Sequence, residues 1–249
     1  MPENASGWTS VTAPAAVSMM QCRMAWLPRE VCEVKAFVFD MDGTLLHTFP
    51  DLAIAANKAI EQMGFPTRTY DELLAFMGFG GKWLINQAVP ASASDDERQR
   101  TFELWRTHYI ESGYIETRPF PGIVDCVREL RARGMKTAIV SNKLDDGVRT
   151  LAAKHFPGLF DAVHGDMPGV PRKPDATVLL QTLDELGVCP KDAVYVGDTN
   201  VDAQTAHNAG VAMVGVSWGY AKADPLLMPG LYAFIRHPAG LLGLAPDES

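Results

Sequence analysis

The sequence lacks the features that would indicate a membrane protein, a disulfide-stapled fold or a zinc site. None of its apolar runs approaches the roughly 18 residues of a membrane-spanning helix. Its four cysteines lie far apart and form neither a CxxC pair nor a cluster with histidine: Cys22, Cys32, Cys126 and Cys189. This spacing argues against a disulfide framework and a zinc site, and it predicts reduced thiols in the cytoplasm.

The chain also carries little of the basic charge that nucleic acids and anionic lipids attract. Lysine and arginine number 22 against 30 aspartates and glutamates, so the 249 residues have a net charge of −8. Both ligands need a basic surface, and we therefore expect no nucleic-acid and no membrane partner. An anionic small molecule would need a local cluster of cations or a metal ion.

The first 33 residues show neither the basic leading region nor the long apolar stretch of a signal peptide. We expect residues 1–33 to form a poorly ordered extension ahead of the folded protein. Met19, Met20 and Met24 are alternative translation starts, and the sequence leaves the choice between them open.

Five short apolar runs predict the strands of a parallel sheet. The first, residues 34–39, is almost unbroken and holds β-branched and aromatic residues, as in a strand covered on both faces. Similar runs follow at residues 136–140, 161–165, 192–196 and 211–216. Amphipathic stretches with helical spacing lie between them, and Gly134 and Gly187 mark two helix ends. This alternation predicts an α/β fold with a Rossmann-like parallel sheet of about five strands.

Between the first two of these strands lies a long block with helical patterns only. Residues 51–117 are too many for an ordinary crossover connection, and a turn-rich segment at 118–122 closes the block. We therefore predict a second, smaller, all-helical cap domain at 51–117. It is inserted into a catalytic core made of residues 34–50 and 118–249.

Two carboxylates follow the first predicted strand. Asp40 and Asp42 stand at its carboxyl end, where open α/β sheets bind ligands, and two such groups can divide the roles of nucleophile and proton donor. Gly43 allows a sharp turn, and the backbone N–H groups of Gly43 and Thr44 can bind phosphate oxygens. Taken alone, the segment is better explained as an ordinary Asp-Gly turn.

Other strand ends and loops carry polar groups that match this site. Ser141 and Asn142 offer a hydroxyl and an amide to phosphate oxygens, and Lys173 offers a cation just ahead of a helix. Asp198 and Asp202 follow the strand at 192–196, and gathered carboxylates are typical of a divalent cation site. Because parallel strand ends meet at one edge of the sheet, we expect these groups to form one site.

Together these motifs resemble, in order, the four motifs of the haloacid dehalogenase superfamily of aspartyl-phosphate hydrolases. They are DMDGT at 40–44, Ser141, Lys173 and GDTNVD at 197–202. The resemblance covers roughly residues 34–245 and is closer to the subgroup with a helical cap after the first motif, which includes phosphoglycolate phosphatases. FPDLAIAANKAIEQMGFP after the first motif and GVSWGY at 215–220 are similar to that subgroup.

The resemblance implies a role for each of these residues. Asp40 attacks phosphorus and becomes an aspartyl phosphate, while Asp42 protonates the leaving alkoxide and then deprotonates water. Ser141 holds phosphate oxygens, and Lys173 balances charge on phosphate and nucleophile. The other phosphate-binding residues are Gly43, Thr44 and Asn142.

A magnesium ion is the implied cofactor. The Mg²⁺ ligands implied by the resemblance are Asp40, the backbone carbonyl of Asp42 and Asp198. Asp202 would be a further ligand or would contact one of these ligands instead of the ion. The ion explains how a phosphate can lie beside several carboxylates in a protein of net charge −8.

The predicted reaction is magnesium-dependent hydrolysis of a small phosphomonoester, with 2-phosphoglycolate as the leading substrate. Dehalogenases of the superfamily lack the second aspartate that Asp42 supplies here, and β-phosphoglucomutases have a histidine where this chain has Leu52. Pyrophosphate, nucleotides and sugar phosphates stay open as substrates, and a mutase is disfavoured. A catalytically silent module that binds a phosphate ligand is the non-enzymatic alternative. We expect a monomer or small homo-oligomer whose partner is the small-molecule phosphoester.

Substrate specificity is expected to come from the cap. Gly80 belongs to a glycine-rich stretch that predicts a loop dipping into the site, with Lys82 meeting a substrate carboxylate. An interhelical turn with a solvated lysine explains the same stretch equally well. His47 is a weaker candidate for the cleft wall. Three large aromatic residues fit a small core inside the cap: Trp83, Trp105 and Tyr109.

Overall fold

The computed structural model of the chain describes residues 33–220 and 231–246. Its centre is a six-stranded sheet in the order β5-β4-β1-β6-β7-β8, and each pair of neighbours is parallel. The strands are β1 (Ala36–Phe39), β4 (Lys136–Leu144), β5 (Ala162–Asp166), β6 (Ala193–Gly197), β7 (Ala212–Val216) and β8 (Leu231–Ile235). Apart from residue 33, the predicted N-terminal extension lies outside the described residues, together with its three methionines.

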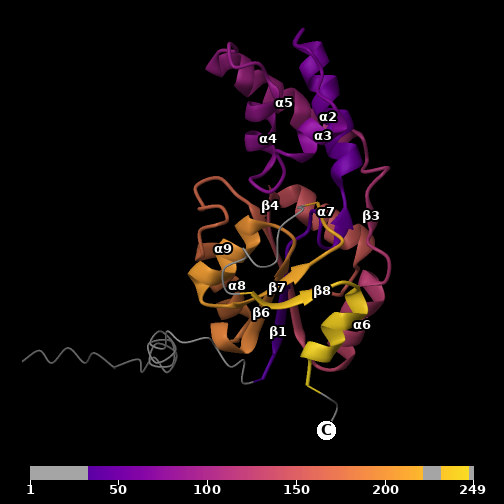
Figure 1. The fold of residues 1–249 in the computed structure, drawn as a ribbon, viewed down its shortest axis with the longest axis vertical. Coiled ribbons are helices and arrows are strands. Elements are labelled where there is room, and N and C mark those ends of the chain that lie inside the picture. The colour runs from indigo at the N-terminus through magenta and orange to yellow at the C-terminus, as the bar shows by residue number, and fades with distance from the viewer. Residues whose placement is uncertain (1–32, 221–230, 247–249) are drawn as a thin grey trace, which may run out of the picture.

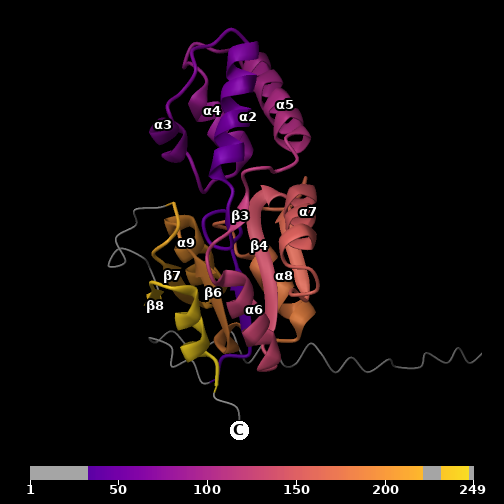
Figure 2. The same cartoon turned by 90° about the vertical axis from the view of Figure 1, so that its right-hand side faces the viewer.

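Helices cover both faces of this sheet, which confirms the predicted Rossmann-like α/β class (Figures 1 and 2). The helices α6 (Ile123–Ala132) and α7 (Asp145–His155) share one apolar cluster with one face of the sheet. The helices α8 (Thr177–Leu186) and α9 (Asn200–Ala209) share a second cluster with the other face. The last described element is a 3₁₀ helix, η3 (Pro238–Leu244), which lies beside α6.

Strand β1 shows why this part of the sequence is almost continuously apolar. It pairs with β4 on one side and with β6 on the other, and all four of its side chains are buried. Phe37 and Phe39 belong to the cluster with α6, whereas Ala36 and Val38 belong to the cluster with α8 and α9. Since successive side chains of a strand point to opposite faces, a strand with both faces covered has no place for a polar residue.

The helical block lies beyond the carboxyl ends of the sheet strands (Figures 1 and 2). It holds α2 (Phe49–Gln62), α3 (Tyr70–Leu74), α4 (Gly81–Ala88) and α5 (Asp95–Glu111). Thr69 and Ser94 each form a capping box at the start of a helix, with a glutamate three residues later. Helix α2 begins two residues before the predicted boundary, so we infer a cap that starts at Phe49.

A short antiparallel ribbon, which the sequence patterns do not predict, joins the helical block to the sheet. It consists of β2 (Leu46–His47) and β3 (Arg118–Pro119), which pair Leu46 with Pro119 and His47 with Arg118. The ribbon brings the start and the end of the block side by side, so the block is connected to the core through two adjacent chain segments.

The sheet differs from the prediction in two places. It has six strands instead of about five, because β8 adds to the edge beside β7. Strand β8 is apolar in sequence but only half-buried. Strand β4 runs on to Leu144 and includes three residues expected after its end, Ser141, Asn142 and Lys143, all of them buried. Among the described residues, no helix combines the length and apolar character needed to cross a membrane.

Candidate active site

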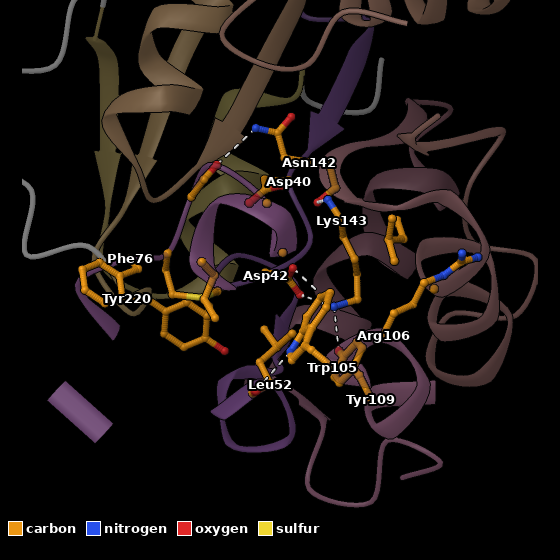
Figure 3. Close-up of a pocket in the computed structure, with 18 of the residues that line it drawn as sticks. Asp40, Asp42, Leu52, Phe76, Trp105, Arg106, Tyr109, Asn142, Lys143 and Tyr220 are labelled. Carbon is orange, nitrogen blue, oxygen red and sulfur yellow. Dashed lines mark hydrogen bonds and ion pairs between the residues drawn. The ribbon is translucent and has the colours of Figure 1, made fainter. Parts of the chain in front are cut away.

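Asp40 and Asp42 lie directly after β1, at the centre of the sheet. The N–H of Asp40 donates to the carbonyl oxygen of Val196 on β6 at 2.9 Å, so the sheet ladder fixes its position. The chain then turns, and the N–H of Leu46 donates to the Met41 carbonyl at 2.9 Å. Both aspartates line one cavity at the carboxyl end of the sheet (Figure 3).

Gly43 is required for this turn. Its φ is +92°, and a Cβ at this position would lie 2.6 Å from Oδ2 of Asp198. The neighbouring Thr44 is fully buried, and its hydroxyl donates to Oδ1 of Asp198 at 3.4 Å. The turn after β1 therefore packs around the carboxylate of Asp198, the residue that directly follows β6.

Lys173 is a buried ammonium with all of its donors in use. Its Nζ donates to Oδ1 of Asp40 at 2.8 Å, to Oδ1 of Asp202 at 2.7 Å and to the Tyr195 hydroxyl at 2.9 Å. Burial disfavours the charged form, yet the carboxylates of Asp202 and Asp40 raise the pKa of Lys173 well above its usual range. Lys173 therefore stays cationic and fixes one oxygen of Asp40.

The carboxyl group of Asp40 has a pKa close to neutral pH. Burial raises the pKa of its carboxyl to about 6, against the opposing attraction of the Lys173 ammonium. The nearby carboxylates of Asp202 and Asp42 raise it further. Above that pH the group is an anion held by one lysine, which suits a nucleophile.

Three buried carboxylates form a set that fits a divalent cation. Asp40, Asp198 and Asp202 each offer an oxygen, and these oxygens lie within 4.8 Å of one another. Asp202 already accepts from Lys173 through Oδ1 and from the backbone N–H and hydroxyl of Thr199 through Oδ2, at 3.0 and 2.6 Å. Asp198 also accepts hydrogen bonds, from the Thr44 hydroxyl and the Tyr220 N–H, so all three carboxylates are held in place around this position.

Ser141 and Asn142 reach the same cavity but differ in their contacts. The Ser141 hydroxyl, which is buried, has a long contact of 3.4 Å with the N–H of Lys143. Asn142 instead donates to the carbonyls of Gly78 and Lys173, and its Oδ1 accepts from the N–H of Lys173 at 2.9 Å. The Asn142 amide thus connects the Lys173 loop to the helical block, although the sequence suggests that it binds phosphate.

The cavity lies between the sheet and the helical block and has a volume of about 230 Å³. The core supplies its polar floor, including Asp40, Asp42 and Lys173. The helical block supplies mostly apolar walls, among them Leu52, Phe76, Met77, Leu84, Trp105 and Ile110. The cavity is therefore polar where the phosphate is expected to bind and mostly apolar where the rest of the substrate, the leaving group, would lie.

Of the specificity residues suggested by the sequence, the structure brings only Gly80 to the cavity. Its φ is +86°, and a Cβ would lie 2.9 Å from the backbone oxygen of Asn142, so the loop packs closely on β4. Lys82 is exposed and does not line the cavity. His47 packs against Phe120 and Tyr220 instead of facing the cavity.

The aromatic residues of the helical block also differ from the expected arrangement. Trp105 and Tyr109 are buried and stack at 5.6 Å, but both also line the cavity. Trp83 is 45% exposed and packs on Phe79, so it is not part of a buried core.

Lys143 is a site residue that our sequence analysis gave no role. Its Nζ lies 3.1 Å from Oδ1 of Asp42 and donates to the Tyr109 hydroxyl at 2.6 Å (Figure 3). Lys143 stands two residues after Ser141 in β4, and alternate residues of a strand share a face. This spacing is the signal that could have pointed to it.

The loop after β7 is a second part of the site to which the sequence motifs assign no role. The N–H of Tyr220 donates to Oδ2 of Asp198 at 2.7 Å. Its hydroxyl accepts from the N–H groups of Thr48 and Phe49, at 2.6 and 2.9 Å. Tyr220 therefore connects a proposed metal ligand to the first turn of α2. In the sequence, only the similarity of GVSWGY at 215–220 to the phosphoglycolate phosphatase subgroup pointed to this loop.

The fold and this arrangement of carboxylates and lysine define a candidate hydrolytic site at the carboxyl edge of the parallel sheet of an α/β protein. The family model described as haloacid dehalogenase-like hydrolase matches residues 37–216. The chain belongs to this family.

Two curated proteins with similar sequences share a name. A phosphoglycolate phosphatase from Aquifex aeolicus is 32% identical over 192 residues, which cover 77% of this chain and 88% of that protein. A phosphoglycolate phosphatase from Nitrosospira multiformis is 32% identical over 211 residues, covering 80% and 93%.

Solved structures show the same fold. A protein from Lactobacillus delbrueckii subsp. bulgaricus superposes with a TM-score of 0.79 and 31% identity, over 86% of this chain and 100% of that one. A predicted phosphoglycolate phosphatase from Haemophilus somnus gives a TM-score of 0.78 and 26% identity, over 85% and 97%.

Proposed function

We propose that this protein is a magnesium-dependent phosphatase that hydrolyses a small phosphomonoester through an aspartyl phosphate on Asp40. The observation that carries the proposal is the pairing of two aspartates with two different lysines in one cavity. Lys173 holds Asp40 at 2.8 Å, and Lys143 holds Asp42 at 3.1 Å. The two carboxylates thus have separate surroundings, as a nucleophile and an acid–base group require.

In the first step, an oxygen of Asp40 forms a bond to phosphorus while the bond from phosphorus to the ester oxygen breaks. Asp42, in its protonated form, gives its proton to that leaving oxygen. In the second step, Asp42 takes a proton from a water molecule, whose oxygen attacks the same phosphorus and releases Asp40. Lys173 stays charged throughout and stabilises the anionic groups around Asp40.

Asp40, Asp198 and the backbone carbonyl of Asp42 would hold the magnesium ion, since Mg²⁺ prefers oxygen ligands. The fit rests on three buried carboxylates whose oxygens lie within 4.8 Å of one another, two of which accept from Lys173. When bound, the ion neutralises charge on the carboxylates and on the phosphate. Ser141 is expected to contact the phosphate oxygens. The N–H groups of Gly43 and Thr44, for which the sequence suggested the same role, instead donate to the carbonyls of Leu46 and Met41 at 3.0 and 3.3 Å.

We propose 2-phosphoglycolate as the substrate. The name shared by the curated relatives supports it, as does the modest cavity of about 230 Å³. Leu52 lines the cavity and offers no proton-transfer group, which argues against a β-phosphoglucomutase-like reaction. Other small phosphoesters and pyrophosphate are the alternatives within this proposal.

A phosphate-release screen tests the function. Purified protein is assayed with 2-phosphoglycolate, sugar phosphates, nucleotides and pyrophosphate, each with Mg²⁺ and with a chelator. We expect metal-dependent release with the highest kcat/KM for 2-phosphoglycolate. Inactivity towards the whole panel would instead favour a silent phosphate-binding module.

A further inference from the structure

Lys143 is a second buried lysine that faces the cavity from the core. Its side chain is 5% exposed, and its Nζ contacts Asp42 at 3.1 Å (Oδ1) and 3.4 Å (Oδ2). The same Nζ lies 2.6 Å from the Tyr109 hydroxyl and 4.5 Å from the centre of the Tyr109 ring. Figure 3 shows it between Asp42 and Tyr109, a residue of helix α5.

The two buried lysines differ in how many of their donors are used. An ammonium has three N–H groups, and Lys173 gives them to three separate partners. Among the described residues, Lys143 donates to two groups, the Asp42 carboxylate and the Tyr109 hydroxyl. The longer contact with Oδ2 of Asp42 is the one that a ligand can replace. Lys143 can therefore donate a hydrogen bond to an anionic ligand and still keep its bonds to Oδ1 of Asp42 and to the Tyr109 hydroxyl.

The location of Lys143 relative to the reaction decides which part of a substrate it meets. A proton donor must lie within about 2.6–3.2 Å of the oxygen that receives the proton, so the ester oxygen is expected beside Asp42. Lys143 contacts that same carboxylate from the cavity side. The atoms nearest to its Nζ are then those that follow the ester oxygen in the leaving group.

The remaining surroundings make Lys143 the best anchor for a negative charge on the leaving group. The walls nearby are apolar or aromatic, including Leu52, Trp105 and Ile110. Arg106 also lines the cavity, but its side chain is 51% exposed, is paired with Asp146 at 3.9 Å and extends away from Asp42 in Figure 3. Lys82, the cation suggested by the sequence, does not reach the cavity.

We propose that Lys143 is the residue that determines specificity for the leaving group, by binding a carboxylate one carbon away from the ester oxygen. The inference rests on the proposed phosphatase function. It transfers the role suggested for Lys82 in the cap to a lysine of the core strand β4. Tyr109 supports the interaction by holding Nζ at the junction of the core and helix α5.

A pair of substrates that differ only in this group tests the proposal. Ethyl phosphate has a methyl group where 2-phosphoglycolate has its carboxylate. We expect the wild type to prefer 2-phosphoglycolate in kcat/KM, and Lys143→Met to lower this preference by about tenfold to hundredfold, as for a lost charged hydrogen bond. Lys82→Met is the matched control and should leave the preference unchanged.

Because Lys143 also contacts Asp42, its replacement is expected to slow the hydrolysis of both substrates. The test is therefore the ratio of kcat/KM for 2-phosphoglycolate to kcat/KM for ethyl phosphate. Equal losses on both substrates would mean that Lys143 only positions Asp42. A wild type without preference for 2-phosphoglycolate would overturn the inference without any variant, while the proposed phosphatase function would stand. A wild type inactive on both substrates would overturn the function itself. If circular dichroism shows that Lys143→Met does not fold, Lys143→Gln gives the same comparison with the hydrogen bonds partly kept.

Discussion

At the scale of single residues, the site depends on how its charges are paired. Asp40 and Asp42 are two residues apart, yet their lysines come from different loops and strands of the core. Burial and neighbouring carboxylates raise the pKa of Asp40 to about 6, and because Lys173 opposes this rise the group is largely an anion at neutral pH. The chemistry and the stability of the protein should therefore both respond to changes at Asp40.

Replacing Asp40 by Asn should abolish turnover while the fold stays intact. The amide oxygen can still accept the hydrogen bond from Lys173, but an amide cannot form the aspartyl phosphate. Phosphate release and circular dichroism measure the two effects. An Asp40→Asn protein with near-normal activity would contradict the assignment of the nucleophile.

The same carboxyl predicts a pH dependence of stability without metal. Its pKa is raised in the folded protein from about 3.8 to about 6, so the folded state binds more protons between these values. The free energy of unfolding should then fall as the pH rises through this window and stay lower above it, by on the order of 3 kcal/mol. Asp40→Asn should lack this contribution. The test is urea unfolding in chelator from pH 4.5 to 7.5, and identical profiles for the two proteins would refute it.

At the scale of elements, the loop after β7 connects the metal site to the helical block. Tyr220 bonds Asp198 with its backbone and the start of α2 with its hydroxyl. Two N–H groups of the first helical turn depend on that hydroxyl, because Thr48 makes no side-chain cap of its own. The loop thus fixes both the carboxylate and the angle at which the chain enters the helical block.

Tyr220→Phe should destabilise the protein by about 1–3 kcal/mol, because both N–H groups lose a buried acceptor. It should also raise KM, since the start of α2 would be held less firmly above the cavity. Chemical denaturation and steady-state kinetics measure these effects. Tyr232→Phe, at a 45% exposed tyrosine of β8, is the control and should change neither quantity. A Tyr220→Phe protein as stable as the control would show that the hydroxyl does not hold the helix.

At the scale of the whole molecule, the cavity lies between the sheet and the helical block, and both contribute to it. Three of its carboxylates offer oxygens within 4.8 Å of one another, and burial together with the nearby carboxylates of Asp202 and Asp42 raises the pKa of Asp40. A cation that binds only the folded state should therefore stabilise the entire protein.

Mg²⁺ at about 100 times its Kd should raise Tm by about 5–10 °C, the shift expected for a ligand that binds only the folded state. Asp198→Asn removes a proposed ligand and should reduce the shift at the same Mg²⁺ concentration. Differential scanning fluorimetry with Mg²⁺ and with chelator gives both values. An equal shift in the variant would place the ion elsewhere.

Much of the fold and the core of the site could be predicted from local patterns. The unbroken apolar run at β1, the helices between the strands and the glycine stop at Gly187 depend on burial and backbone geometry within a few residues. Carboxylates at the strand ends follow from the rule that parallel strands meet at one edge. Strand β8, which was missed, lies at the edge of the sheet and is only half-buried, so its pairing with β7 decides its place.

The sequence by itself determined the α/β core, the order of the motifs and Asp40 as the central carboxylate. These features depend on the spacing of apolar residues and on which residues follow each strand, and both can be read locally. Only the tertiary structure decided that Lys143 meets Asp42, 101 residues away, and that Tyr220 meets the start of α2. It also showed that Lys82 is exposed and that His47 faces aromatic rings. Such contacts depend on sheet register and on where the helical block lies above the sheet, and no local pattern encodes either of them.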